Sequence, residues 1–219
     1  MYKQILDFLF NLHWNTALPS GVQVLNPWTD TDVQELCTRF YTRYFGEHRP
    51  RTMLMGINPG RFGGGVTGIA FTDPIRLSSC GIDNNLQART ELSSDFIYRV
   101  ITAYGGALKF YSDFYINSVV PLGFTRDGKN LNYYDIPELK QQAIHQIPGW
   151  MQQHLEMPIR RDRLICIGEG KNLEVLSALN ETHSWFGSIE GLPHPRYVMQ
   201  YRRSEINASI DRYLKVLAG

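Results

Sequence analysis

The sequence predicts an α/β protein, a three-layer α/β/α sandwich around a central, mainly parallel sheet of four strands. Two observations lead to this fold class. Short apolar runs typical of buried strands alternate along the chain with helical patterns. Polar residues end or follow three of these runs, and sheets of this class bind ligands at the carboxyl ends of their strands. With 219 residues, the chain is long enough for one domain.

The expected elements follow one another without repeats or long linkers. Residues 1–219 are expected to form a single domain, on which an N-terminal helical segment of about residues 1–45 packs. Apolar runs predict strands at residues 52–57, 114–120, 164–168 and 185–189. Helical patterns predict helices at residues 32–45, 95–104, 136–155 and 172–179, and a last helix from about Ser204.

Composition excludes several classes of protein. No apolar run reaches the ~18 residues of a membrane span, so we expect no membrane contact. The N-terminal helix carries Asp7 and lacks a small-residue cleavage site, which argues against a signal peptide. Three cysteines are scattered singly, which fits a reducing cytoplasm and predicts neither a zinc nor an iron–sulfur site. The net charge of +1 means that any nucleic acid must bind through local clusters of cations.

The most informative segment is a glycine-rich loop after the first predicted strand. Residues 55–71 contain six glycines, which let a flat ligand approach the backbone closely. Pro59 stiffens the chain next to the polar side chain of Asn58, and Phe71 offers an aromatic face at the end of the loop. This combination suits a planar heterocycle such as a nucleobase.

Two further residues are candidates for the same site. His194 lies between Pro193 and Pro195, which hold its backbone out of a helix, and Asn117 lies within a predicted buried strand. Taken singly, each candidate also has a structural interpretation. Asn58 could be a turn residue, Phe71 a core ring, and His194 or Asn117 a buried group with hydrogen-bond partners.

The order of these motifs resembles a known family. The sequence GINPGRFGGGVTGIAF at residues 56–71 aligns without a gap to the pattern G-M-N-P-G-P-F-G-x-x-x-T-G-x-x-F of the uracil-DNA glycosylase superfamily. This pattern belongs to its single-strand-selective monofunctional branch, and the bacterial SMUG2 type is the expected subgroup. Residues 117–122 are similar to the family's N-x-x-P-L motif, with one extra residue before the proline. The resemblance covers roughly residues 40–215 and implies the glycosylase fold.

The resemblance implies a role for each matched residue. Asn58 would position the attacking water, and His194 would donate a hydrogen bond to uracil O2 as negative charge develops there. Asn117 would read the base, because its amide can bond O4 and N3–H together. Phe71 would stack on the base. Further substrate-binding residues in the first motif are Gly56, Ile57, Pro59 and Gly60, the last beside the pyrimidine 5-position, where a glycine makes the pocket permissive.

A third group of residues is expected to contact DNA. Arg196 would fill the space that the flipped base leaves in the helix, but the segment from His194 to Arg196 is two residues shorter than the family's H-P-S-P-R. Tyr197 follows Arg196 on the side that would face DNA. Arg202 and Arg203 would add local positive charge for phosphates, or would simply be solvated surface charges. Arg61 replaces a family proline and is a further candidate phosphate contact, and Asp73 is a candidate neighbour of the site.

The sequence therefore predicts a monofunctional DNA glycosylase that acts on uracil in base excision repair. Whether it also accepts xanthine or hypoxanthine stays open. No lysine lies in the matched motifs, which argues against a Schiff-base lyase, and neither metal nor cofactor is expected. A monomer acting on damaged DNA of the bacterial nucleoid, in the cytoplasm, is the expected setting. The alternative is a non-catalytic nucleotide or nucleic-acid binding module. A phosphate cradle is disfavoured because no Gly-Lys-Ser/Thr follows the glycines.

Overall fold

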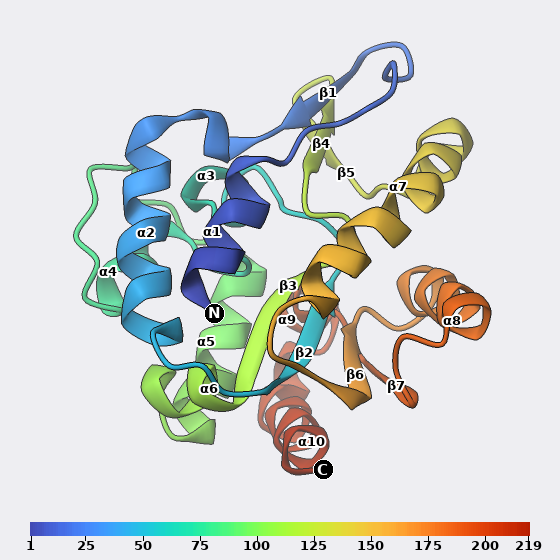
Figure 1. The fold of residues 1–219 in the computed structure, drawn as a ribbon. Helices are drawn as coiled ribbons and strands as arrows, with labels where there is room; N and C mark the ends of the chain where they lie inside the picture. Colours follow the sequence, from blue (N-terminus) through green and yellow to red (C-terminus); the bar gives the residue numbers. More distant parts are fainter.

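The computed structural model describes all residues 1–219 and centres on a four-stranded parallel sheet with strand order β3-β2-β6-β7 (Figure 1). Helices cover both faces, so the predicted three-layer α/β/α architecture is confirmed. The strands are β2 (Arg51–Gly56), β3 (Phe114–Ser118), β6 (Ile159–Ile167) and β7 (Ser188–Leu192).

The two strands β2 and β3 are buried along their whole length, as expected for parallel strands covered on both faces. The prediction for the last strand was wrong by several residues. Trp185 and Phe186 are buried ahead of β7, where the Asn180 side chain bonds both the N–H and the C=O of Phe186. Ladder pairing with β6 begins only at Ser188. A buried apolar segment of a loop therefore has the same sequence pattern as a buried strand.

One face of the sheet is covered by α7 (Pro137–Leu155) and α8 (Lys171–His183), with α1 (Tyr2–Phe10) beside α7. The contact between α1 and α7 is aromatic, with the rings of Phe8 and His154 4.3 Å apart. The other face is covered by α5 (Leu92–Tyr104), α9 (Pro195–Tyr201) and α10 (Ile206–Ala218). Phe96 of α5 and Tyr213 of α10 pack with ring centres 5.0 Å apart.

The N-terminal segment is only partly helical, because it contains a strand that the sequence analysis did not predict. After α1 the chain forms β1 (Val22–Leu25) and a 3-10 turn, η1 (Pro27–Thr29), before α2 (Thr31–Phe45). Asp30 caps α2 by accepting a hydrogen bond from the Asp32 N–H at 2.9 Å. At the β3 edge of the sheet, α2 packs against α6 (Ala107–Asp113), with the rings of Phe40 and Tyr111 5.2 Å apart.

Strand β1 belongs to a second, antiparallel sheet with order β1-β4-β5. Its other strands, β4 (Gly123–Arg126) and β5 (Lys129–Leu131), form a hairpin. The turn consists of Asp127 and Gly128, whose φ angles of +50° and +68° are those that a tight two-residue hairpin needs. This small sheet carries the chain after β5 across the carboxyl ends of the parallel strands.

Asp73 has a structural role. It is fully buried and caps the short helix α4 (Pro74–Ser79), accepting from the Arg76 N–H at 2.9 Å. Its second oxygen accepts from the Glu91 N–H at 3.0 Å. Asp73 thereby ties the end of the glycine loop to the start of α5, and it does not line the pocket described below.

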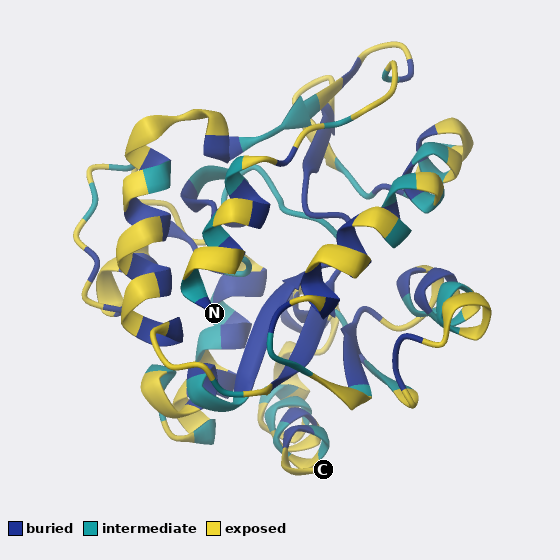
Figure 2. Cartoon of the chain, in the orientation of Figure 1, coloured by how far each residue is buried: buried dark blue, intermediate teal, exposed yellow.

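A continuous hydrophobic core runs through all of these layers and includes side chains from both the first and the last helix. Figure 2 shows β2 and β3 buried, the second half of β6 buried and its first half exposed, and the helices buried on their inner sides only. None of the helices has the length and apolar character needed to cross a bilayer. All three cysteines are free and buried, and burial raises the pKa of Cys37 and of Cys166 to about 12, so neither thiol is a nucleophile.

Candidate active site

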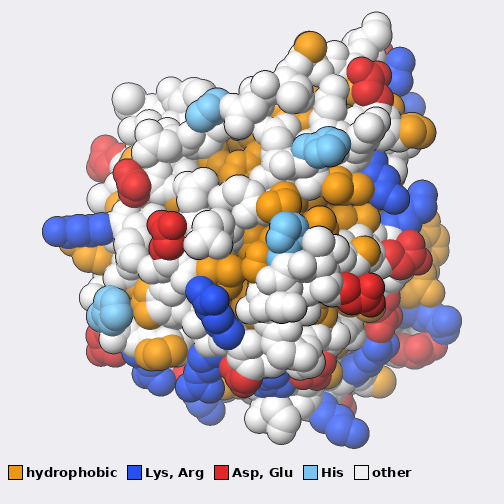
Figure 3. All heavy atoms as spheres, turned by 45° about the vertical axis from the view of Figure 1, so that its right-hand side comes forward, with side chains coloured by type: hydrophobic (Ala, Val, Ile, Leu, Met, Phe, Trp, Pro, Cys, Tyr) orange, Lys and Arg blue, Asp and Glu red, His pale blue; other side chains and the backbone are white.

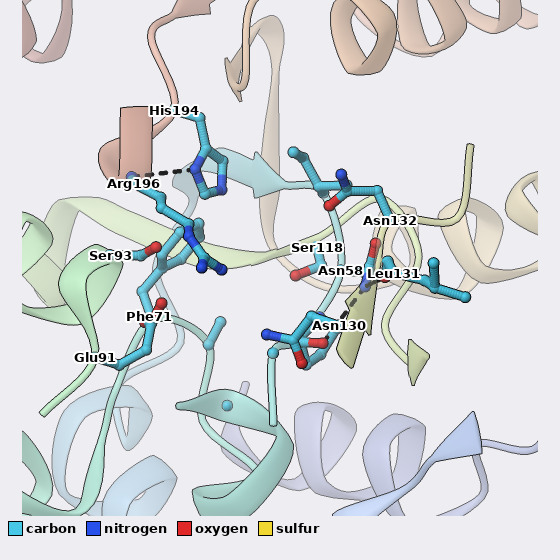
Figure 4. Close-up of a pocket in the computed structure, with 15 residues that line it drawn as sticks. Asn58, Phe71, Glu91, Ser93, Ser118, Asn130, Leu131, Asn132, His194 and Arg196 are labelled. Atoms are coloured by element: carbon cyan, nitrogen blue, oxygen red, sulfur yellow. Dashed lines mark hydrogen bonds between the residues drawn. The ribbon is translucent and has the colours of Figure 1, made fainter. Parts of the chain in front are cut away.

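A pocket of about 90 Å³ lies at the carboxyl ends of the parallel strands. It gathers residues from the glycine loop, the start of α5, the end of β3, strand β5 with the residue after it, and the start of α9 (Figure 4). The lining residues are Ile57, Asn58, Pro59, Gly60, Gly64, Ala70, Phe71, Glu91, Ser93, Ser118, Asn130, Leu131, Asn132, His194 and Arg196.

Asn58 follows β2 and is held by backbone from the second sheet. Its Nδ2 donates to the Leu131 carbonyl at 3.0 Å, and its Oδ1 accepts from the Tyr133 N–H at 3.0 Å. These two bonds permit only one orientation of the amide, because exchanging oxygen and nitrogen would set donor against donor. Oδ1 keeps a second lone pair for a water or a substrate group.

Phe71 ends the glycine loop in a strained conformation. Its φ of +52° lies in the left-handed region, which costs a non-glycine residue about 1–3 kcal/mol. The ring packs directly over Gly56, where an added Cβ would come within 2.6 Å of the ring Cζ. Gly56 does not line the pocket itself. Its missing side chain provides the room in which the Phe71 ring lies.

Most of the other glycines in this loop are needed because a Cβ would collide with neighbouring atoms of the protein, and not because a ligand approaches them. A Cβ on Gly68 would lie 2.6 Å from Cys37 Sγ, and one on Gly65 would lie 2.6 Å from the Gly60 carbonyl oxygen. Only Gly60 and Gly64 line the pocket. The expectation that the glycines as a group expose bare backbone is therefore wrong, because Gly65 leaves room for another part of the loop and Gly68 for α2.

His194 is the N-cap of α9, and its ring faces the pocket from the side opposite Asn58 (Figure 4). Its Nδ1 accepts a hydrogen bond from the Arg196 N–H at 3.2 Å. Desolvation, followed by the charge of Arg196, lowers the pKa of His194 to about 4. The imidazole is therefore neutral near pH 7, and its single proton lies on Nε2, because Nδ1 is an acceptor. An N–H donor is thus available to a group in the pocket.

Asn117 is not among the residues that line the pocket. Its side chain is buried, with Nδ2 donating to the Tyr115 hydroxyl at 2.8 Å and Oδ1 accepting from the Ser118 N–H at 2.8 Å. The neighbouring Ser118 lines the pocket instead. Successive side chains of a strand point to opposite faces, so only one of this pair can reach the site. The amide expected to read the base is used to fix the end of β3.

The residues expected to contact DNA fall into two groups. Arg196 lines the pocket, and Arg61 lines a groove next to it. Tyr197, Arg202 and Arg203 line neither. Arg202 instead pairs with a carboxylate of its own segment. On the face shown in Figure 3, basic and acidic side chains are interspersed along the lower and right-hand margins, without a continuous basic surface.

Sequence reasoning did not identify several polar residues that line the pocket. They come from the start of α5 and from the chain around β5, and they are Glu91, Ser93, Asn130 and Asn132. A signal for the second group was present, since Asp-Gly between two short polar–apolar stretches is typical of a hairpin. No group of three or more His, Cys, Asp or Glu side chains is placed to hold a metal ion.

Comparisons with known proteins agree with this geometry. The model of the uracil DNA glycosylase superfamily matches residues 43–218. The crystal structure of wild-type SMUG2 from Pedobacter heparinus superposes with a TM-score of 0.96 at 37% sequence identity, over 99% of this chain and 96% of that one. No curated protein matches the chain. The family match covers most of the sequence and includes every element that forms the pocket, so the chain belongs to the uracil-DNA glycosylase superfamily and is a DNA-repair glycosylase.

Proposed function

We propose that this glycosylase hydrolyses the N-glycosidic bond of uracil in DNA and so initiates base excision repair. The observation that supports this most strongly is the presence of Asn58, Phe71 and a neutral His194 around one small pocket. Breaking the bond leaves negative charge on the departing base and positive charge on the sugar. The target nucleotide must also leave the base stack to reach such a pocket.

His194 stabilises the leaving group. Its Nε2–H donates to uracil O2 as that oxygen becomes negative, while the Arg196 N–H holds the ring through Nδ1. Removing one preorganised donor of this kind typically costs about 2.7–4 kcal/mol of transition-state stabilisation. A neutral imidazole suits an anionic leaving group, because its hydrogen bond to uracil O2 strengthens as charge develops there while the proton stays on Nε2.

Asn58 positions the water that attacks the sugar. The free lone pair on Oδ1 accepts a hydrogen bond from this water, and the bonds to the chain around residues 131–133 keep the amide fixed. An amide is a poor general base, so the reaction depends more on His194 than on activation of the water. Phe71 stacks on the base, an interaction worth about 1–3 kcal/mol per base.

Base recognition is assigned to Ser118, with Gly60 leaving room beside the ring. A hydroxyl both donates and accepts, so Ser118 can bond O4 or N3–H of uracil but discriminates less sharply than an amide. This tolerance supports activity on xanthine and hypoxanthine as well as uracil. No lysine lines the pocket, which supports a monofunctional enzyme that leaves the abasic strand intact.

A panel of oligonucleotides with one uracil, xanthine or hypoxanthine, followed by alkaline cleavage of abasic sites, tests these assignments. We expect Asn58→Ala and His194→Ala to lose most uracil excision while still binding the DNA. Ser118→Ala should lower the rate on uracil and change the ratio between the three bases. Asn117→Ala should lower thermal stability, because it leaves the Tyr115 hydroxyl without its partner.

The same panel separates excision from binding alone. Tight binding to uracil-DNA without cleavage by the unmodified protein would favour a non-catalytic module. A fully active Asn58→Ala variant would refute the water-positioning role. An enzyme whose base preference is changed by Asn117→Ala but not by Ser118→Ala would refute the assignment of Ser118.

We further infer that the chain acts as a single-domain monomer on the bacterial nucleoid, in the cytoplasm. Its continuous core and three free, buried cysteines support this setting. Light scattering on the purified protein would test the monomer, and one cooperative unfolding transition would be expected of the single domain. A stable dimer at micromolar concentration would contradict the inference.

A further inference from the structure

A second hollow, of about 360 Å³, opens directly beside the base pocket. The two share Glu91, Asn130 and Arg196 in their walls. A segment of polymer lying in this hollow would therefore lead straight into the pocket. We call it the cationic groove, and its lining residues are Arg61, Phe62, Thr90, Glu91, Leu92, Lys129, Asn130 and Arg196.

Four cations from separate parts of the chain meet at this groove. Arg61, Lys129 and Arg196 line it. Arg89 joins them, because its guanidinium carbon lies 3.7 Å from the centre of the Phe62 ring, and that of Arg61 lies 4.4 Å from the same centre. The ring thus holds two guanidinium groups in place by cation–π contact. None of the four cations forms an ion pair with a carboxylate.

The single acidic residue in the groove wall is occupied elsewhere. Glu91 caps α5, where its Oε2 accepts from the Ser94 N–H at 3.1 Å. The charge of its carboxylate is therefore directed toward the positive end of that helix. By contrast, on the far side of α9, Arg202 pairs with Glu205 at 3.3 Å and Arg212 pairs with Glu169. All four cations at the groove are thus without a carboxylate partner, whereas on the other side, among Arg202, Arg203 and Arg212, only Arg203 is unpaired.

We propose that the cationic groove binds the sugar-phosphate backbone of the strand that carries the damaged base. Arg89 and Lys129 are assigned as phosphate contacts, and Phe62 as the residue that positions the Arg89 and Arg61 guanidinium groups. The strand then enters the pocket from the hairpin side and not along Arg202 and Arg203. The proposal rests on the proposed function for the identity of its ligand, DNA, but it concerns binding and not bond cleavage.

The test uses the double variant Arg89→Ala/Lys129→Ala and the control Lys3→Ala/Arg160→Ala. Both variants remove one arginine and one lysine from exposed positions, and neither Lys3 nor Arg160 forms an ion pair. The probe is a single-stranded oligonucleotide with a tetrahydrofuran abasic site, so no base can be excised. The dissociation constant of this probe is measured by fluorescence anisotropy at roughly 50 to 300 mM NaCl. This range resolves the slope of log K against log [salt].

Each phosphate contact on a single strand contributes about −0.7 to the slope of log K against log [salt]. Losing two contacts should make the slope less steep by about 1.4, which corresponds to about 25-fold weaker binding at 0.1 M salt. The control should bind like the unmodified protein. Phe62→Leu should weaken binding about two- to fivefold with an unchanged slope, because the charges remain but their positions are no longer fixed.

Binding of Arg89→Ala/Lys129→Ala with unchanged affinity and slope would overturn the proposal, and so would an equal loss in the control. Excision of uracil is measured separately, with saturating enzyme in single turnover. There the control Lys3→Ala/Arg160→Ala should match the unmodified rate, because both substitutions lie outside the groove and the pocket. If the unmodified protein excises no uracil, the proposed function fails while the binding experiment still decides the role of the groove.

Discussion

The sharpest chemical prediction concerns the protonation state of His194 during catalysis. Its pKa is lowered to about 4 by desolvation and by Arg196, and its Nδ1 accepts from a backbone N–H. Protonation would place a second proton on Nδ1 and set it against that N–H. The active form is therefore the neutral imidazole, and it should persist well below the pH at which an ordinary histidine titrates.

The magnitude follows from the lowered pKa. At pH 5 about 90% of His194 stays neutral, whereas a histidine with an unperturbed pKa of about 6.5 would be only about 3% neutral, a difference of roughly 30-fold. The excision rate should thus be nearly flat from about pH 8 to pH 5.5 and fall only below about pH 5. The assay is single-turnover excision of uracil from an oligonucleotide with saturating enzyme, which separates the chemical step from binding.

The His194→Ala variant provides the baseline for this experiment. It should be slower than the unmodified enzyme by about 10²- to 10³-fold across the range, with no inflection near pH 4. A rate that drops about 30-fold between pH 8 and pH 5 would mean that the pKa is not lowered. A rate that rises steadily on acidification would mean that the imidazolium is the donor. Either result would refute the reasoning.

Two further predictions test the packing behind the site. Gly56→Ala should displace the Phe71 ring, because the new Cβ would lie 2.6 Å from it, and a shift of about 1 Å can cost about 10²-fold in excision rate. Gly149→Ala, an exposed helix position with nothing within 4 Å of the new Cβ, is the control and should leave the rate unchanged. The buried His154 ring has two nitrogens without hydrogen-bond partners, and desolvation lowers its pKa from 6.5 to about 3. The unfolded chain therefore binds a proton more readily than the folded protein, and stability falls as the pH drops below 6.5. In urea unfolding, the unmodified protein should lose about 2 kcal/mol more stability between pH 8 and pH 5 than His154→Phe does; an equal loss in the two proteins would contradict this.

The centre of the sheet could be predicted from sequence because β2, β3 and the second half of β6 are buried and appear as short apolar runs, whereas the partly exposed β7 was misplaced. The second sheet could not be found in this way. Its strands are short, and β5 is largely exposed, so no apolar run marks them. Only the Asp127-Gly128 turn carries a local signal, in the form of a dipeptide suited to positive φ. The consequence is large, since this hairpin carries the backbone that orients Asn58.

The candidate site was predictable where a motif fixes the spacing and ambiguous where it does not. Asn58 and Phe71 lie in a stretch aligned without a gap, and both line the pocket. The second motif has one extra residue, so counting forward selects Asn117, whereas counting back from Pro121 selects Ser118. Since strand side chains alternate between faces, a slip of one residue exchanges a core position for a pocket position. Pattern matching alone does not choose between these two alignments.

The shortened segment after β7 has a physical consequence for His194. With Pro195 immediately behind the histidine, a helix starts at once, and proline at the first helical position needs no hydrogen-bond partner for its nitrogen. The histidine is then the N-cap, and the first free N–H of the helix, that of Arg196, points at its Nδ1. The same short sequence therefore starts α9, selects the Nε2–H tautomer of His194, and brings the charge of Arg196 close enough to help keep the ring neutral.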